Sequence, residues 1–171
     1  MRRITTLTLV VVLAAASCMH LDEARVATPA EGPELTGAWR STLTFKDGAF
    51  AGIKGLEFMY VFNLGGTMTE SSNYDGAPPV PPAYGVWRRL GRGEFEAKYE
   101  YYATKAPARL EEITSGGGWL PSGRGVFVEH IILSVDGRSL TSTLRYEALD
   151  LEGKPADGGG EAEGRGVRID F

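Results

Sequence analysis

Apolar and polar residues alternate along most of the chain after residue 35, and turn residues separate the alternating runs. A period of two is typical of β-strands with one buried face. No stretch of convincing length shows the 3.6-residue period of an amphipathic helix. The pattern predicts roughly eight strands, at residues 39–45, 56–63, 67–72, 84–90, 94–103, 125–135, 140–149 and 161–169.

Short turns join most of these runs, so neighbouring strands are expected to pair antiparallel. Gly65-Gly66 and Asp136-Gly137 are typical of tight hairpins. Eight antiparallel strands with one apolar face close well into a small barrel. We therefore predict an all-β fold in residues 35–171, an up-and-down antiparallel β-barrel of roughly eight strands.

Two connections, residues 75–83 and 104–123, are longer than a hairpin needs. The second is expected to contain one or two helical turns at residues 109–113. Long loops on a small barrel are often functional, so both are expected at its rim or over its mouth. Residues 150–160 are expected to form a Gly-rich loop.

Composition narrows the class of protein. The 171 residues, 43% hydrophobic and 10% aromatic, suit one globular domain. The net charge of −4 gives no electrostatic reason to expect a nucleic-acid partner. With one cysteine and two histidines, and no Gly-rich loop followed by Lys-Ser or Lys-Thr, neither a metal nor another cofactor is expected.

The first residues are expected to be a targeting segment. In residues 1–18, two arginines follow Met1, then come an apolar run and a group of small residues before Cys18, as in signal peptides. Cys18 resembles the lipidated cysteine of bacterial lipoproteins, although Ala15 stands where that motif usually has Leu. Ordinary cleavage after Ala16 is the alternative. Residues 19–34 are polar and suit a flexible tether.

These features predict an exported protein of the cell envelope, periplasmic or at the outer membrane or cell surface, and otherwise a secreted one. The lipid on Cys18 would be its contact with the membrane.

Two motifs carry a family resemblance. Gly37-Ala38-Trp39 resembles the Gly-x-Trp that begins lipocalins, and Gly85-Val86-Trp87-Arg88-Arg89 resembles a pattern of uncharacterised bacterial lipocalin-like proteins. In that superfamily the Trp closes the barrel floor and an Arg of the last strand packs across it, which implies these roles for Trp39 and Arg168. The resemblance implies a lipocalin-like (calycin-type) barrel but no single function, because the superfamily includes carriers and enzymes.

Four tyrosines are candidates for a ligand-binding wall. Tyr99 and Tyr101 share the inward face of one predicted strand, and Tyr60 and Tyr146 lie on others. In a barrel with an open mouth, such residues become the polar groups of an apolar pocket. We therefore expect non-covalent binding of a small hydrophobic or amphipathic molecule. The small residues Ala162, Gly164 and Gly166 of the last strand indicate close packing or reserved space.

Glu129 and His130 are adjacent in one strand, so one of them faces the interior. If His130 faces inward, it is a near-neutral general base. If Glu129 does, with Ile131 and Leu133, a carboxylate lies inside and is expected to pair with Arg168. Ile131 and Leu133 are the better core pair, which favours the second register. Catalysis as an isomerase or cyclase, and a solid barrel with a structural or interaction role, remain the alternatives to binding.

Overall fold

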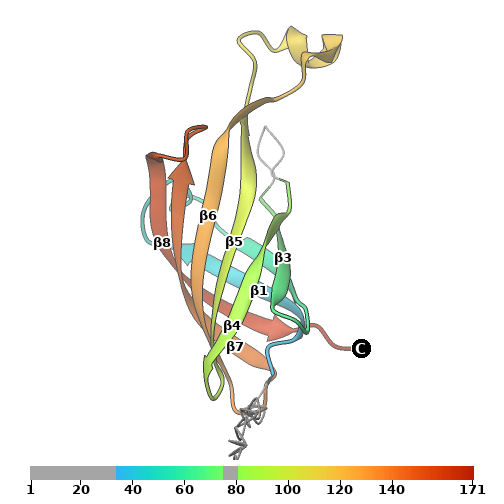
Figure 1. The fold of residues 1–171 in the computed structure, drawn as a ribbon, viewed down its shortest axis with the longest axis vertical. Coiled ribbons are helices and arrows are strands. Elements are labelled where there is room, and N and C mark those ends of the chain that lie inside the picture. The colour runs from blue at the N-terminus through green and yellow to red at the C-terminus, as the bar shows by residue number, and fades with distance from the viewer. Residues whose placement is uncertain (1–33, 75–80) are drawn as a thin grey trace, which may run out of the picture.

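The computed structural model describes residues 34–74 and 81–171, and the expected signal peptide, Cys18 and most of the tether lie outside these ranges. Eight strands form one closed barrel in which each strand pairs antiparallel with its neighbours in sequence and β8 pairs with β1 (Figure 1). The strands are β1 (Gly37–Phe45), β2 (Leu56–Phe62), β3 (Thr67–Ser72), β4 (Ala83–Gly91), β5 (Glu94–Lys105), β6 (Leu120–Leu133), β7 (Ser139–Leu149) and β8 (Pro155–Arg168). The predicted all-β barrel is confirmed.

Two strands begin five or more residues before the alternation predicts. β6 begins at Leu120 and β8 at Pro155, within the segments expected to be loops. The added residues pair through their backbones: Thr104 opposes Pro121, and Leu149 opposes Pro155. Backbone pairing needs no apolar side chain, so a Gly-rich strand end leaves no period-two signal.

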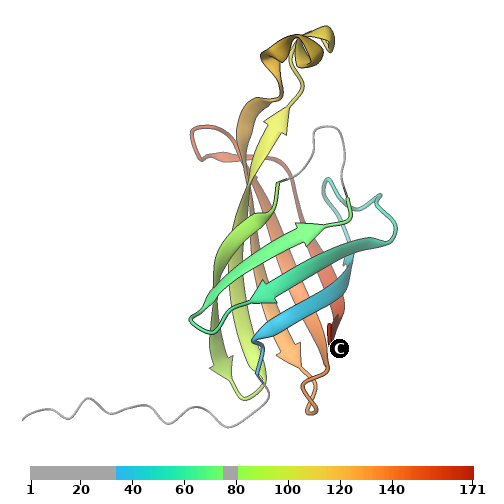
Figure 2. The same cartoon turned by 90° about the vertical axis from the view of Figure 1, so that its right-hand side faces the viewer.

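The ends of β5 and β6 form an arm that extends away from the barrel (Figures 1 and 2). Its tip carries the short helical turn η1 (Ile113–Gly117), a few residues later than expected. Gly116 has φ of 94° inside this turn, a conformation that glycine adopts readily. No helix within residues 34–74 and 81–171 is long and apolar enough to cross a membrane.

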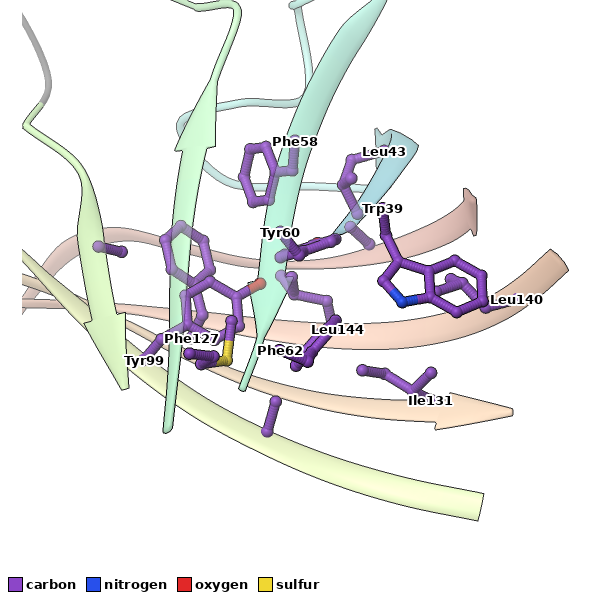
Figure 3. Packing of buried hydrophobic residues seen from close by; sticks show 14 of the residues in the cluster. Trp39, Leu43, Phe58, Tyr60, Phe62, Tyr99, Phe127, Ile131, Leu140 and Leu144 are labelled. Carbon is purple, nitrogen blue, oxygen red and sulfur yellow. The ribbon is translucent and has the colours of Figure 1, made fainter. Parts of the chain in front are cut away.

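Side chains of alternating strand positions pack against one another inside the barrel (Figure 3). The end that we call the floor holds Trp39, whose indole nitrogen donates a hydrogen bond of 2.8 Å to the carbonyl of Leu35. The end that we call the mouth lies near the arm and is occupied by aromatic rings, which include Phe45, Tyr101 and Tyr146. The core thus runs the length of the barrel.

Candidate functional site

The floor is held by an arginine from the last strand. The guanidinium carbon of Arg168 lies 4.4 Å from the ring centre of Trp39. Its Nη1 donates to the carbonyl of Thr36 at 2.7 Å and its Nε to the carbonyl of Gly137 at 3.0 Å, and Nη2 donates to the carbonyl of Glu34. The side chain therefore joins the chain before β1 to the β6–β7 turn and stacks on the indole.

The favoured register of β6 is confirmed, because Glu129 is fully buried and Ile131 and Leu133 lie beside it in the core. The expected pairing of Glu129 with Arg168 is wrong. All the hydrogen bonds given above for Arg168 are to backbone carbonyls at the floor, whereas Glu129 bonds to Tyr99 further along the barrel. His130 points outward, and its Nε2 lies 2.7 Å from a carboxylate oxygen of Glu94 on the neighbouring strand.

A group of polar side chains lies inside the otherwise apolar barrel, and we call it the buried polar cluster. It comprises Ser41 of β1, Tyr60 of β2, Glu70 of β3, Tyr99 of β5, Glu129 of β6 and Ser142 of β7. The hydroxyl of Tyr99 donates a 2.8 Å hydrogen bond to Oε2 of Glu129. Six different strands thus bring polar atoms to the middle of the barrel, where few hydrogen-bond partners are available.

Several atoms of this cluster have no hydrogen-bond partner among the described residues. They are Oγ of Ser41 and of Ser142, the hydroxyl of Tyr60, Oε1 of Glu70 and Oε1 of Glu129. Buried polar atoms are almost always hydrogen-bonded, and each exception requires an explanation. The buried polar cluster therefore has unused capacity for hydrogen bonds.

The surroundings of the two carboxyl groups favour their neutral form over the ionised one. Burial raises the pKa of Glu129, and the nearby hydroxyls of Ser142, Tyr99 and Tyr60 lower it in part. Of these hydroxyls, that of Tyr99 meets the geometry of a hydrogen bond. Burial, and secondly the charge of Glu129, raises the pKa of Glu70 to about 8. A carboxyl group with a pKa near neutrality can take up or release a proton under ordinary conditions.

A small cavity of about 20 Å³ lies at the mouth, with Glu70 of the cluster in its wall. Its lining residues are Phe50, Leu56, Phe58, Glu70, Ser72, Tyr74, Tyr101 and Phe127. Such a volume accommodates about one water molecule. Glu70 is the carboxyl group that contributes to the lining, and Glu129 lies deeper in the barrel. We call this space the mouth pocket.

Phe50, in the β1–β2 connection, closes the mouth pocket from outside. Its ring centre lies 5.1 Å from that of Phe45, 5.0 Å from that of Tyr146 and 6.1 Å from that of Tyr74. The residue belongs to a run of turns rather than to a strand. A change of the Phe50 side-chain rotamer would therefore enlarge the mouth pocket while the strand pairings stay intact.

The four tyrosines of the expected binding wall lie at two levels. Tyr60 and Tyr99 belong to the buried polar cluster in the middle of the barrel, with ring centres 6.0 Å apart (Figure 3). Tyr101 and Tyr146 lie at the mouth, where their hydroxyl oxygens are 3.0 Å apart and share a hydrogen bond. Of the four, Tyr101 is the one that lines the mouth pocket.

The small residues of β8 are explained by close packing. A Cβ atom added to Gly164 would lie 2.3 Å from Oγ of Ser142 and 3.2 Å from Leu43. One added to Gly166 would lie 3.0 Å from Leu140. Side chains of β1 and β7 thus occupy the space that these glycines leave.

The sequence analysis did not identify Glu70, Phe50, Ser41 or Ser142 as candidate site residues. For Glu70 a signal was available, because it stands two residues after Met68 in a strand and therefore shares the inward face. No comparable signal marks Phe50, which lies in a turn.

Larger hollows lie on the outer surface. One of about 480 Å³ is lined by residues that include Tyr84, Lys98 and Arg124, and one of about 460 Å³ lies beside the arm. Arg124 in the first hollow pairs with Glu100 at 2.8 Å, so these two charges already have partners. Among the residues that the structure describes, no three His, Cys, Asp or Glu side chains are grouped as a metal site would require.

Comparison with models of known protein families gives no match, and no curated protein sequence matches the chain. The chemistry of the barrel interior is therefore the basis for a functional proposal.

Proposed function

We propose that the protein binds a small apolar or amphipathic molecule inside the barrel, through the mouth pocket. The observation that carries this proposal is Glu70, a buried carboxyl group with one oxygen unpartnered, at the wall of a cavity otherwise lined mainly by aromatic rings. Apolar walls with few polar groups are characteristic of small-molecule sites. Because the cavity is small, binding requires Phe50 to move outward.

A neutral solvatochromic dye tests this proposal. Its emission should shift to shorter wavelength on binding. Ser72→Trp fills the mouth pocket and should weaken the dye's affinity at least about tenfold, since the site loses its volume. Ser71→Trp places the same side chain on the outer face of β3 and serves as the matched control. Equal affinities of these two variants, or no binding by the unaltered protein, would contradict the proposal.

Proton transfer is a second candidate function, in which the protein is a small isomerase or cyclase. It is favoured by one observation, the Tyr99 hydroxyl bonded to the buried Glu129. A carboxyl group of raised pKa is suited to act as a general base, and a tyrosine hydroxyl can stabilise a developing oxyanion. Glu129 does not line the mouth pocket, so we favour binding. Loss of turnover in Glu129→Gln, with His130→Gln unchanged, would favour the enzyme.

We also propose that the barrel is lipocalin-like. The closed eight-stranded antiparallel arrangement is compatible with that fold, and the stacking of Arg168 on Trp39 supports it.

Export and lipidation are likewise proposals, which rest on residues 1–18 and on Cys18. Incorporation of a labelled fatty acid in the host, abolished by Cys18→Ser, is the expected result. Release of an unlabelled protein cleaved before Cys18 would favour secretion instead.

A further inference from the structure

The barrel interior holds two carboxyl groups without a basic partner. In the described part of the chain, the groups that shift the pKa of Glu70 and Glu129 include no Lys, Arg or His side chain. On the outer surface, by contrast, the three carboxyl groups of Glu96, Glu100 and Glu163 each pair with a basic residue at 2.5–2.8 Å. Ionisation of either buried carboxyl group would therefore place a negative charge inside the barrel without a neutralising cation among the described residues.

Packing alone does not account for this arrangement. An unpaired carboxyl group in an apolar interior destabilises a fold, and an apolar residue of similar size is often better tolerated. Tyr99 supplies one hydrogen bond to Glu129, while Oε1 of each carboxyl group is left without a partner. These oxygens accept hydrogen bonds in the ionised state, so the group that completes the site is a donor.

The walls of the mouth pocket favour a cationic donor over a neutral one. Five aromatic residues surround the space next to Glu70, namely Phe50, Phe58, Tyr74, Tyr101 and Phe127. The faces of aromatic rings carry negative potential and attract ammonium groups. A carboxylate with aromatic rings around it is therefore complementary to an amine with an apolar body. A positive charge at Glu70 would also reduce the repulsion between Glu70 and Glu129.

We infer that the mouth pocket selects an organic amine, whose ammonium group pairs with the carboxylate of Glu70 while its apolar body lies against Phe58, Phe127 and Tyr101. The inference rests on the proposed binding function and specifies the chemical class of the ligand. Glu129 lies deeper in the barrel and does not line the mouth pocket, so Glu70 is the carboxylate that the ligand contacts.

Binding of an ammonium ion by Glu70 is coupled to the release of its proton. The titratable groups that act on Glu70 or are acted on by it are Glu129, Tyr60, Tyr99 and Tyr101. The tyrosines remain neutral, because burial raises the pKa of each of them. Glu70, with a pKa of about 8, is mostly protonated at lower pH, so affinity should rise about tenfold per pH unit up to about pH 8.

The test compares three probes of similar shape: 2-phenylethylamine, the neutral 2-phenylethanol and the anionic 3-phenylpropanoate. Calorimetric titration of the barrel should give at least about tenfold tighter binding of the amine than of the alcohol, and the weakest binding for the anion. Glu70→Gln should remove the preference for the amine and its pH dependence. Glu57→Gln, on the outward face of β2, is the matched control and should retain both.

The outcomes separate the inference from the proposed function. Equal binding of amine and alcohol, or an unchanged preference in Glu70→Gln, would overturn the inference and leave the binding function standing. Failure of all three probes and of the neutral dye would overturn both. Glu70→Gln replaces a carboxyl group whose ionisation is unfavourable with a neutral amide of the same volume, so a folded variant is expected and circular dichroism checks it.

Discussion

The hydroxyl of Tyr99 donates a hydrogen bond of 2.8 Å to Oε2 of Glu129, and both side chains are closed off from solvent. This bond joins β5 to β6 in the middle of the barrel. In the antiparallel pairing of these two strands, Tyr99 lies opposite Phe127 and Glu129 lies opposite Ala97. It satisfies one oxygen of the carboxyl group and leaves Oε1 without a partner. The pair is therefore both a structural contact and an incomplete polar site.

Removal of the Tyr99 hydroxyl should destabilise the fold. Tyr99→Phe leaves Oε2 of Glu129 without its donor, and loss of a buried partner of a polar group costs about 1–3 kcal/mol. Urea unfolding at neutral pH measures the change. Tyr102→Phe, on the exposed side of the same strand, is the control and should stay within about 0.5 kcal/mol. Equal stabilities of the two variants would show that the Tyr99–Glu129 hydrogen bond contributes nothing to the stability of the fold.

The stability of the fold should decrease as the pH rises from about 4.5 to about 8. Glu70 has a pKa of about 8 in the folded state and an ordinary value of 4.5, and the pKa of Glu129 is raised too. Between these values the unfolded chain has released protons that the folded chain retains, so the free energy of unfolding falls with pH. One pKa unit corresponds to about 1.4 kcal/mol, so the total is a few kcal/mol.

Urea unfolding across this pH range tests the sign as well as the size. Glu70→Gln should flatten the profile in part, because Glu129 still titrates, and should raise stability at the alkaline end. Glu57→Gln should follow the unaltered protein. A stability that increases with pH over the same range in the unaltered protein would contradict the assignment of raised pKa values.

The register of β6 was predictable from the sequence, and the partners of its inward residues were not. Ile131 and Leu133 identify the buried face of the strand, and Glu129 follows from the period of two. The neighbour of Glu129 depends on the shear of the closed barrel, which shifts each strand against the next. That shift places Tyr99 next to Glu129, whereas the sequence suggested Arg168 as its partner.

The early starts of β6 and β8 and the closure of the mouth show a second limit of prediction from the sequence. Residues 155–160 are largely glycine and polar residues, and their membership of β8 comes from backbone pairing with β7. Phe50 closes the mouth from a turn, where no period predicts which way a side chain points. Local patterns thus predict strands with a buried face, while tertiary pairing alone defines the strand ends and the closure of the pocket.

Gly85 is expected to tolerate no side chain. A Cβ atom at this position would lie 2.1 Å from the carbonyl oxygen of Lys98 and 2.6 Å from Cα of Tyr99. Both obstacles are backbone atoms, so β4 and β5 would have to separate beside the buried polar cluster. Gly85→Ala should cost about 1–3 kcal/mol of stability in thermal or urea unfolding.

Gly52→Ala provides the control for this substitution, since no atom lies within 4 Å of the added Cβ. It should leave stability unchanged or raise it slightly, because alanine restricts the unfolded chain. If Gly85→Ala and Gly52→Ala have the same free energy of unfolding, the close approach of β4 to β5 at Gly85 is absent.

Lysine should not be able to replace Arg168 in stabilising the floor of the barrel. Its guanidinium donates to three backbone carbonyls and stacks on Trp39, a combination that needs a planar group with several donors. Arg168→Lys keeps the charge but loses the planar group with its several donors. We therefore expect the free energy of unfolding to fall by about 1–3 kcal/mol and the near-ultraviolet dichroism signal of Trp39 to weaken. Arg165→Lys, on the exposed face of the same strand, should change neither quantity. If the two lysine variants are equally stable, charge alone is sufficient at position 168, and the floor does not depend on the shape of the guanidinium group.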